Sequence, residues 1–427
     1  MKNLKNLRGT IDLPPEKLIK WQNVEEIIKQ QLLRASVKEI RTPIIEMTEL
    51  FVRGIGESTD VVNKEMYTFT DRGNRSCTLR PEGTASVARA IINDGNLKNS
   101  PQKLWYMGPM FRYERPQAGR QRQFHQLGVE FIGYESPISD VKIISLAWDI
   151  LQRLGVIELN LEINSLGDKS DRESFRKSFI KWLENNFESL DKDSQSRIYK
   201  NPLRILDTKN SQTQEVLENA PKLNNYLSEK SVQRYSIIKK QLQDLQIPYT
   251  ENPKLVRGLD YYSHTAFEIT SSALGSQATV CGGGRYDDLI DQMGGSRTPS
   301  IGFAIGLERL ILIAGKDLER ARNTDIYIVN KGDLAESLAL ELSRKLGAFD
   351  LVTELDLSGA SFSKQFKKAN KFNTKSVVVI GDKEAMKKEF SIRLFIEDQD
   401  NNDEQTILLE DNVKLKEWIC RNLKSTI

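Results

Sequence analysis

Apolar residues recur at helical spacing near the start of the chain, over residues 17 to 36. They stand three or four positions apart, at Leu18, Trp21, Val24, Ile27, Ile28, Leu32 and Leu33, and this spacing predicts an amphipathic helix. The segment EIRTPIIEM follows, and its Pro43 cannot donate a backbone hydrogen bond to a neighbouring strand. The pattern therefore predicts a helix that leads into a strand at an exposed or edge position, with short strands continuing to Gly133.

The composition changes between Asp168 and Tyr249, where charged, helix-favouring residues dominate. The runs RESFRKSFIKWLENNF and KSVQRYSIIKKQLQDL are typical of this stretch. Strand and glycine signals resume at Leu255 and continue through GFAIGLERLILIAG. We therefore interpret residues from about 168 to 250 as a helical insertion.

A third pattern begins after Arg322, where short apolar strands alternate with helical stretches. The order is DIYIVN, LAESLALELSRKLG, DLVTEL, SFSKQFKKANKF and SVVVIG. Such alternation predicts a separate α/β domain with a largely parallel sheet. A length of 427 residues also favours more than one domain. We expect a first domain over residues 1 to 322 and a second over residues 323 to 427.

Charge and hydropathy exclude some classes of protein. The formal charge of +3 does not indicate a general nucleic-acid binder, so any RNA surface must be a local patch. The longest apolar candidate, Ile301 to Gly315, is interrupted by Glu308 and Arg309, so no membrane span is predicted. The first residues lack the apolar region of a secretory signal. These features predict a cytosolic or organelle-matrix location, and of the two we expect a cytoplasmic protein without a membrane partner.

Cysteine and histidine are scarce in this chain. Cys77, Cys281 and Cys420 are far apart and form no CxxC pair, which argues against a disulfide framework. The only histidines are His125 and His264. We therefore expect no zinc site and interpret the cysteines as reduced packing residues.

The most informative stretch is MFRYERPQAGRQRQFHQLGVEFIGY, residues 110 to 134. A strand period of two places Arg112 and Glu114 on one face and Phe111 and Tyr113 on the other. The Pro- and Gly-containing segment from Pro116 to Gln123 is predicted to be a long hairpin loop.

The returning strand alternates as well. One face holds Phe124, Gln126, Gly128 and Glu130, whereas Leu127, Val129 and Phe131 form the face expected in the core. A carboxylate pairs with an ammonium, a ring stacks on adenine and an arginine braces a phosphate, so the polar face suits an amino acid beside a nucleotide. Taken alone, the same hairpin equally fits a solvated sheet face.

Several segments together resemble a known family. The hairpin resembles motif 2 of class II aminoacyl-tRNA synthetases, TPIIEM resembles motif 1, and SIGFAIGLERLIL, residues 300 to 312, resembles motif 3. In isolation the last segment would be a core strand and helix. LVRGLDYYSHTAFEI, residues 255 to 269, and CGGGRYDDLI, residues 281 to 290, resemble the two signature stretches of histidyl-tRNA synthetases.

The resemblance covers nearly the whole chain, and LRPEGT, residues 79 to 84, adds to it. The departures are in the helical insertion and in EDQDNNDEQ, residues 397 to 405. It implies an α+β fold: a class II catalytic domain built on an antiparallel sheet with a helical insertion, followed by an α/β anticodon-binding domain.

The implied reaction activates L-histidine with ATP to histidyl-adenylate and transfers it to the 3′ end of histidine tRNA for protein synthesis. The resemblance further implies Mg²⁺ with the ATP, no zinc, no organic cofactor, no editing domain, and a homodimer joined near motif 1.

The resemblance also assigns roles to single residues. The implied catalytic residues are Arg112, Arg257 and Arg309, with Arg257 replacing a metal ion used by related synthetases. Histidine contacts are implied for Glu82, Gly83, Thr84, Arg112, Gln126, Glu130, Arg257, Tyr261 and Tyr262. ATP contacts are implied for Arg112, Glu114, Phe124 and Arg309.

Two basic segments are candidates for tRNA contact. The motif 2 loop carries Arg115, Arg120 and Arg122, which could reach acceptor-stem phosphates. The C-terminal stretch SFSKQFKKANKF presents Lys364, Lys367, Lys368 and Lys371, which could follow an RNA backbone. Both patterns also occur on solvated surfaces without any RNA role.

Three other functions share part of this pattern. The regulatory subunit of ATP phosphoribosyltransferase resembles the catalytic domain, but it typically lacks the C-terminal domain and parts of the signatures. A prolyl or threonyl ligase shares motifs 2 and 3 but is not expected to carry LVRGLDYY and CGGGRYD. A pure RNA-binding module would not need the three arginines at positions 112, 257 and 309.

Overall fold

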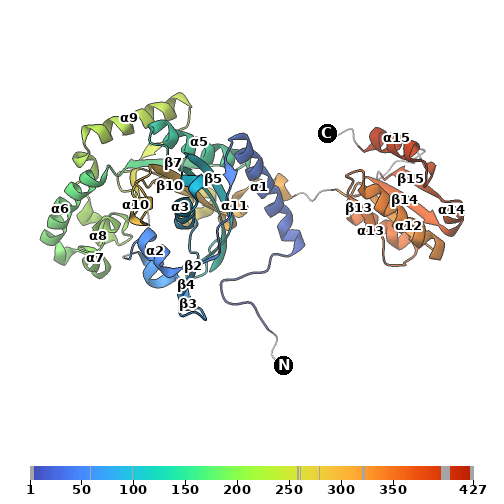
Figure 1. Cartoon of the computed structure of the whole chain (residues 1–427), viewed down its shortest axis with the longest axis horizontal. Helices are drawn as coiled ribbons and strands as arrows, with labels where there is room; N and C mark the ends of the chain where they lie inside the picture. Colours follow the sequence, from blue (N-terminus) through green and yellow to red (C-terminus); the bar gives the residue numbers. More distant parts are fainter. Residues whose placement is uncertain are drawn as a thin grey trace. The chain divides into compact units, whose positions relative to one another are not determined.

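The computed structural model describes residues 4–57, 59–98, 100–256, 259, 261–277, 279–319, 323–395 and 404–423. The chain divides into two compact units, residues 1–319 and 320–427 (Figure 1). Among the described residues, no helix combines the length and the apolar character that a membrane crossing requires.

An eight-stranded sheet organises the first unit, and its inner pairs are antiparallel. Only the two short edge strands pair in parallel fashion. In spatial order the strands are β1 (Lys38–Glu39), β5 (Gln102–Phe111), β6 (Gln123–Ile132), β11 (Ser300–Gly306), β10 (Thr279–Arg285), β9 (Ser263–Ser271), β7 (Leu159–Ser165) and β8 (Thr250–Glu251).

The main core lies on one face of this sheet. Helices α1 (Pro15–Arg34), α5 (Pro137–Arg153) and α11 (Leu307–Ile313) pack there against the side chains that alternate along the strands. The predicted N-terminal helix is thereby confirmed, and Trp21, Val24, Ile28 and Leu32 are its buried residues. Helix α3 (Thr84–Asn93) belongs to a separate cluster that includes Tyr106, Tyr261 and Tyr286.

The segment EIRTPIIEM does not form one strand. It is divided between β1, at the edge of the large sheet, and β2 (Ile45–Met47), at the edge of a small sheet with β4 (Ser76–Leu79) and β3 (Tyr67–Thr70). Pro43 lies in neither strand. The expected edge position is correct, but the proline separates two edge strands of different sheets. Short helices α2 (Thr48–Ile55), η1 (Val61–Glu65) and α4 (Gly95–Lys98) complete this region.

Helices fill the segment between β7 and β8. They are α6 (Lys169–Asn185), η2 (Phe187–Ser189), α7 (Lys192–Arg197), η3 (Pro202–Asp207), α8 (Ser211–Leu217), η4 (Leu223–Tyr226) and α9 (Glu229–Asp244). The first six surround their own core, in which the Phe175 and Phe179 rings stack 5.2 Å apart. Helix α9 instead contributes Tyr235, Ile238 and Leu242 to the main core. After the insertion, η5 (Ser272–Gln277), α10 (Leu289–Gln292) and η6 (Lys316–Glu319) connect the remaining strands.

The second unit is a five-stranded mixed sheet between helices. Strands β13 (Thr353–Leu355), β12 (Ile326–Lys331) and β14 (Ser376–Gly381) are parallel, and β15 (Glu389–Leu394) and β16 (Gln405–Leu408) continue antiparallel. The predicted parallel sheet is thus correct for three strands only. The helices are α12 (Asp333–Gly347), α13 (Phe362–Lys371), α14 (Asp382–Met386) and α15 (Asn412–Asn422). On α13, Lys368 lies 3.3 Å from buried Asp356, whereas Lys364, Lys367 and Lys371 are exposed.

A buried ionic cluster joins β10 to helices α5 and α9. The Arg285 side chain is fully buried and donates to Asp140 at 2.6 Å and to Asp287 at 3.0 Å. Arg234 of α9 also donates to Asp140 at 2.6 Å. Burial alone would raise the pKa of Asp140, but the guanidinium groups outweigh it and the pKa lies below its ordinary value.

Removing the shared carboxylate should destabilise the first unit strongly. Asp140→Ala leaves the Arg285 charge buried without its main partner, so we expect a loss of about 3–5 kcal/mol in the free energy of unfolding. Denaturant unfolding followed by circular dichroism measures it. The control is Asp193→Ala, which removes an exposed pair with Arg197 and should cost less than about 1 kcal/mol. Equal losses in the two variants would contradict a structural role for the cluster.

Candidate active site

Small residues line the face of the large sheet opposite the main core, and they make room there for larger side chains from neighbouring segments. Gly128 pairs with Ala304, and Ala304 in turn pairs with Gly282. One step along the strands, Glu130 pairs with Gly302, which pairs with Gly284. We call Gly128, Gly282, Gly284, Gly302 and Ala304 the small-residue floor. A Cβ atom at Gly302 would overlap the Glu130 carboxylate, so glycine is required there.

The alternation predicted for the returning strand is confirmed. Leu127, Val129 and Phe131 are buried in the main core. Glu130 lies on the other face with the floor and is only 1% exposed. The period of two along β6 thus separates a packing face from a face that carries chemistry.

Three hydroxyl groups surround the Glu130 carboxylate. It accepts hydrogen bonds from Thr84 Oγ1 at 2.7 Å, from Tyr286 OH at 2.5 Å and from Tyr106 OH at 3.4 Å. Burial raises its pKa to about 8, even though these hydrogen bonds favour the charged form. Near neutral pH, both the protonated and the charged form of Glu130 are therefore populated. Such a group can donate a hydrogen bond to a neutral imidazole ring or accept one from it.

Tyrosine rings form one wall beside Glu130. The Tyr261 and Tyr262 ring centroids are 4.7 Å apart, and Tyr261 meets Tyr286 edge-on at 5.7 Å. Burial holds the pKa of Tyr261 well above its ordinary value, so the hydroxyl stays protonated. The structure thus brings both predicted tyrosines to Glu130, together with Tyr106 and Tyr286. We call Thr84, Tyr106, Glu130, Tyr261, Tyr262 and Tyr286 the Glu130 site.

Glu82 lies at the amino end of α3. Its two carboxylate oxygens accept from the backbone N–H groups of Thr84 and Ala85, each at 2.7 Å. Glu82 is buried, and burial raises its pKa. A Cβ at Gly83 would overlap the Tyr106 ring. Glu82 therefore holds the start of α3, while its oxygens retain lone pairs for an ammonium group.

Arg112 and Glu114 do not lie on the strand predicted for them. Strand β5 ends at Phe111, because the Tyr113 N–H bonds to the Glu65 carbonyl at 2.7 Å rather than to the partner strand. Glu114 remains close, with its carboxylate 3.7 Å from Arg112 Nη1.

The Arg112 guanidinium connects two predicted segments. Its Nε donates to the Pro81 carbonyl at 2.8 Å, and its Cζ lies 5.4 Å from the centroid of the Phe124 ring. Arg112 therefore sits between the LRPEGT segment and the aromatic side chain expected to stack on adenine.

Gln126 supplies an acceptor that the described part of the chain leaves unused. Its Oε1 atom is buried and has no hydrogen-bond partner there. Buried polar atoms are normally paired, so an unpaired acceptor beside the floor indicates a position where a ligand would donate.

Arg309 lies at the other end of the floor, in the first turn of α11. Its Nη1 donates to the Thr279 carbonyl at 2.8 Å. A Cβ at Gly119 of the motif 2 loop would come within 2.9 Å of its side chain. Burial and the neighbouring Arg120 both lower the pKa of Arg309, and Glu114 opposes them. The loop, Glu114 and Arg309 are thus close together.

The three loop arginines differ in their surroundings. Arg115 and Arg120 are exposed, and Arg120 lies 3.4 Å from the Glu114 carboxylate. Arg122 is half-buried: its guanidinium lies 3.6 Å from the Tyr113 ring centroid and donates to the Glu114 carbonyl. The Arg122 N–H also bonds to the Gly9 carbonyl at 2.7 Å. Arg122 therefore holds the loop together, whereas Arg115 is available to a partner.

Three residues remain: Arg257, which was predicted, and Tyr106 and Tyr286, which were not. Arg257 lies outside the described residues. Tyr106 and Tyr286 contact Glu130, although no separate signal in the sequence selected them. The CGGGRYDDLI match contained Tyr286, and the adjoining glycines were the signal that could have indicated a site at that position.

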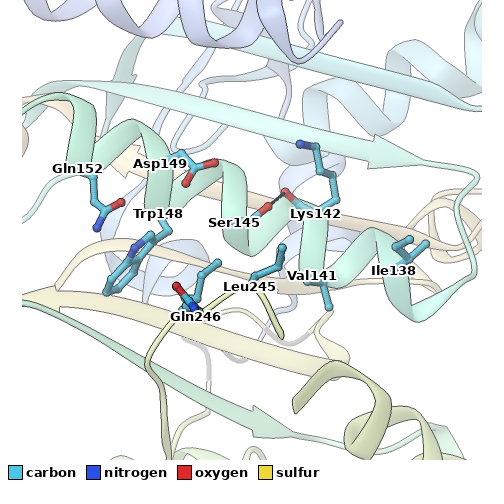
Figure 2. A pocket seen from close by; sticks show the side chains of 10 residues that line it. Ile138, Val141, Lys142, Ser145, Trp148, Asp149, Gln152, Leu245 and Gln246 are labelled. Carbon is cyan, nitrogen blue, oxygen red and sulfur yellow. Dashed lines mark hydrogen bonds between the residues drawn. The ribbon is translucent and has the colours of Figure 1, made fainter. Parts of the chain in front are cut away.

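A hollow of about 450 Å³ occurs elsewhere in the first unit (Figure 2). It lies between α5 and the turn after α9, on the side of the sheet that faces the main core. Its lining is Ile138, Val141, Lys142, Ser145, Trp148, Asp149, Gln152, Leu245, Gln246 and Ile247. The sheet separates this hollow from Glu130, so it is not part of the same site.

Comparisons with known proteins agree with this geometry. The family model described as histidyl-tRNA synthetase matches residues 9–310, and the anticodon binding domain model matches residues 325–416. A "Histidine--tRNA ligase" of Prochlorococcus marinus (strain MIT 9312) is 74% identical over 425 residues, covering 100% of both chains. One from Synechococcus sp. (strain RCC307) is 53% identical and covers 96% of this chain and 98% of its own.

A solved structure gives the same result. The apo histidyl-tRNA synthetase of S. aureus superposes with a TM-score of 0.80 at 38% identity, covering 97% of this chain and 99% of that one. The predicted family and the α+β fold class are confirmed, which decides against the regulatory subunit, the prolyl or threonyl ligase and the RNA-binding module. The chain therefore belongs to the histidyl-tRNA synthetase family and has its ligase activity, the joining of histidine to tRNA.

Proposed function

We propose that the Glu130 site holds the imidazole ring of histidine and that the small-residue floor beside it holds the rest of the amino acid and ATP. The observation that carries this proposal is the buried Glu130 carboxylate, which lies beside the small-residue floor and whose pKa is raised to about 8 by burial. Glu130 and Tyr262 face the ring. Glu82, Gly83, Thr84, Gln126 and Tyr261 surround the α-amino and carboxylate groups.

The activation step needs alignment and fixed positive charge. A carboxylate oxygen of histidine attacks the α-phosphorus of ATP, an O–P bond forms, and the bond to the leaving pyrophosphate breaks. Arg112 braces the carboxylate and the α-phosphate, and Arg309 meets the γ-phosphate and the adenine. Phe124 and Glu114 bind the adenine side of ATP. The family resemblance alone supports Arg257 as the third arginine, lying across the reacting groups.

Magnesium is proposed only as a companion of ATP. The described residues contain no group of three or more His, Cys, Asp or Glu side chains that could hold a metal ion. Mg²⁺ is commonly bound by substrate phosphates with few protein ligands. We therefore assign no residue to this ion and no step to it.

We further propose a cytoplasmic homodimer. The support is the small sheet near motif 1, which exposes several large apolar side chains, an arrangement typical of an interaction surface. Those residues are Ile44, Ile45, Met47 and Phe69, each 40–51% exposed. A cytoplasmic location follows from the activity, since charged tRNA is consumed by ribosomes in that compartment.

For transfer, we propose that Arg115 and Arg120 contact the acceptor stem and the extra 5′ guanylate of histidine tRNA. Arg122 supports them by holding the loop. On the second unit, exposed Lys364, Lys367 and Lys371 are proposed to contact the anticodon arm, while Lys368 is paired with Asp356.

The first test replaces the Glu130 carboxylate. Glu130→Gln keeps the size of the side chain but presents an amide, so we expect kcat/KM for histidine in pyrophosphate exchange to fall by about 10²-fold or more. The control is Glu162→Gln on outer strand β7, which should retain activity. Circular dichroism and thermal unfolding establish that both variants are folded. Exchange at the unmodified rate in Glu130→Gln would refute the site.

The second test follows the Glu130 proton. Because burial raises its pKa to about 8, the empty site holds a proton at pH 7.5 that must leave when the carboxylate accepts the imidazole N–H. We expect histidine binding to release about three quarters of a proton at pH 7.5 and less as the pH rises through 8. Calorimetry in two buffers of different ionisation enthalpy measures the release. Identical heats in both buffers would contradict it.

The third test separates tRNA contact from loop support. Arg115→Ala should raise KM for tRNA about fivefold, because one phosphate contact is lost. The slope of log affinity for tRNA against log salt concentration should fall by about one. Pyrophosphate exchange, which needs no tRNA, should stay unchanged. Arg122→Ala should impair exchange as well, because Arg122 holds the loop beside Glu114. An unchanged KM for tRNA in Arg115→Ala would remove Arg115 from the interface.

A further inference from the structure

The helical insertion leaves the large sheet directly beside the Tyr261–Tyr262 segment. Two backbone hydrogen bonds join the segments: Leu166 N–H to the His264 carbonyl at 2.5 Å, and His264 N–H to the Gly167 carbonyl at 2.7 Å. His264 has φ +48°, a left-handed conformation that residues other than glycine rarely adopt. The surroundings must hold this conformation, so the segment depends on the start of the insertion.

Arg172 adds a side-chain connection at the same junction. It lies on α6, and its Nη1 donates to the Tyr262 carbonyl at 2.5 Å. Its Nη2 lies 3.7 Å from Asp288 Oδ2, and the two side chains are only 19% and 23% exposed. Tyr262 and Asp288 belong to the two separate signature stretches. One guanidinium of the insertion therefore holds both stretches in place.

The first turn of α6 is also tied to α9. The Asp171 carboxylate accepts from the Ser228 N–H at 2.9 Å and from Ser231 Oγ at 2.5 Å. Asp171 is 4% exposed and precedes Arg172 directly. A displacement of the insertion at this end must therefore move the backbone that carries Arg172.

The junction is not closely packed beside these contacts. A hollow of about 410 Å³ opens between the start of α6, the start of β9 and α10. Its lining is Asp168, Lys169, Ser170, Ser263, His264, Asp288, Asp291 and Arg297. The Tyr262 ring packs on the apolar core of the insertion, and beside the hollow specific bonds add to this packing in holding α6 against the Tyr262 segment.

We propose that Arg172 is a positioning residue that couples the insertion to histidine binding. The inference rests on the role proposed above for Tyr261 and Tyr262. The Arg172 bond fixes the backbone of Tyr262, the Tyr262 ring packs on Tyr261, and Tyr261 packs on Tyr286, which donates to Glu130. Movement of α6 therefore changes the wall of the Glu130 site without any insertion residue touching the substrate.

A split between two Michaelis constants tests this role. Arg172→Met keeps the apolar stem but removes the donors, and we expect KM for histidine in pyrophosphate exchange to rise about tenfold. KM for ATP should change by less than about twofold, because Arg172 supports only the tyrosine wall. Arg172→Lys should recover part of the loss, since an ammonium group can still donate to one of the two oxygen partners.

Arg176→Met is the matched control. Arg176 lies one turn further along α6, and its Nη2 donates to the Tyr199 carbonyl at 2.9 Å, inside the insertion. The chemistry of the bond is the same, but it does not reach the Glu130 site. This variant should leave KM for histidine unchanged, and thermal unfolding compares the stability of the two variants.

Hydrogen exchange gives a second readout. Histidine should slow amide exchange in the first turns of α6 in the unmodified chain and in Arg176→Met, but not in Arg172→Met. The proposal is overturned if KM for histidine is unchanged in Arg172→Met, if both Michaelis constants rise in parallel, or if Arg176→Met has the same effect. Failure of the proposed site is distinguishable, because Glu130→Gln would then leave kcat/KM for histidine in pyrophosphate exchange unchanged, whatever the effect of Arg172→Met.

Discussion

The buried pair between Arg285 and Asp140 is the interaction on which the active-site sheet depends. Strand β10 contributes Gly282 and Gly284 to the small-residue floor, so it has no side chains on that face to fix its position. Its last residue, Arg285, instead enters the opposite side of the sheet and binds helix α5 through Asp140. The next residue, Tyr286, donates to Glu130. Two consecutive residues thus connect the scaffold to the site, and a shift of one must displace the other.

The glycines of the small-residue floor have a structural cost that the surroundings offset. Glycine in a strand lacks packing and loses more entropy on folding than other residues. Here its use is steric, because a Cβ at Gly302 would overlap the Glu130 carboxylate and a Cβ at Gly128 would overlap the Tyr106 ring. The polar groups left around the floor are held by bonds from several separate segments, including those of Thr84 and Tyr286. Such distributed support keeps a buried carboxylate in a fixed position, as a binding site requires.

The parts that could be predicted from sequence are those set by local periodicity. The alternation along β6 followed directly from the strand period, and the helix before Arg34 followed from apolar spacing. The parts that could not were set by distant partners. Strand β5 ends at Phe111 because Tyr113 bonds to Glu65, and Arg285 meets an aspartate 145 positions away. Neither contact can be predicted from the local pattern of residues. The family resemblance identified the segment around Arg285 but did not explain the role of that residue.

The place of the insertion in the topology explains why it meets the active site at all. Strands β7 and β9 are antiparallel neighbours in the sheet, and β8, where the insertion ends, pairs with the other side of β7. Both ends of the insertion are therefore anchored to β7. The Tyr261–Tyr262 segment directly precedes β9, which pairs with β7 up to the point where the insertion begins, so this segment borders the start of α6. A connection between neighbouring strands only has to close a loop, and the entropic cost of closing a loop rises slowly with its length. Helices can thus be enlarged or replaced at this point while the junction keeps its contact with the Tyr262 carbonyl, a backbone group that no substitution at position 262 removes.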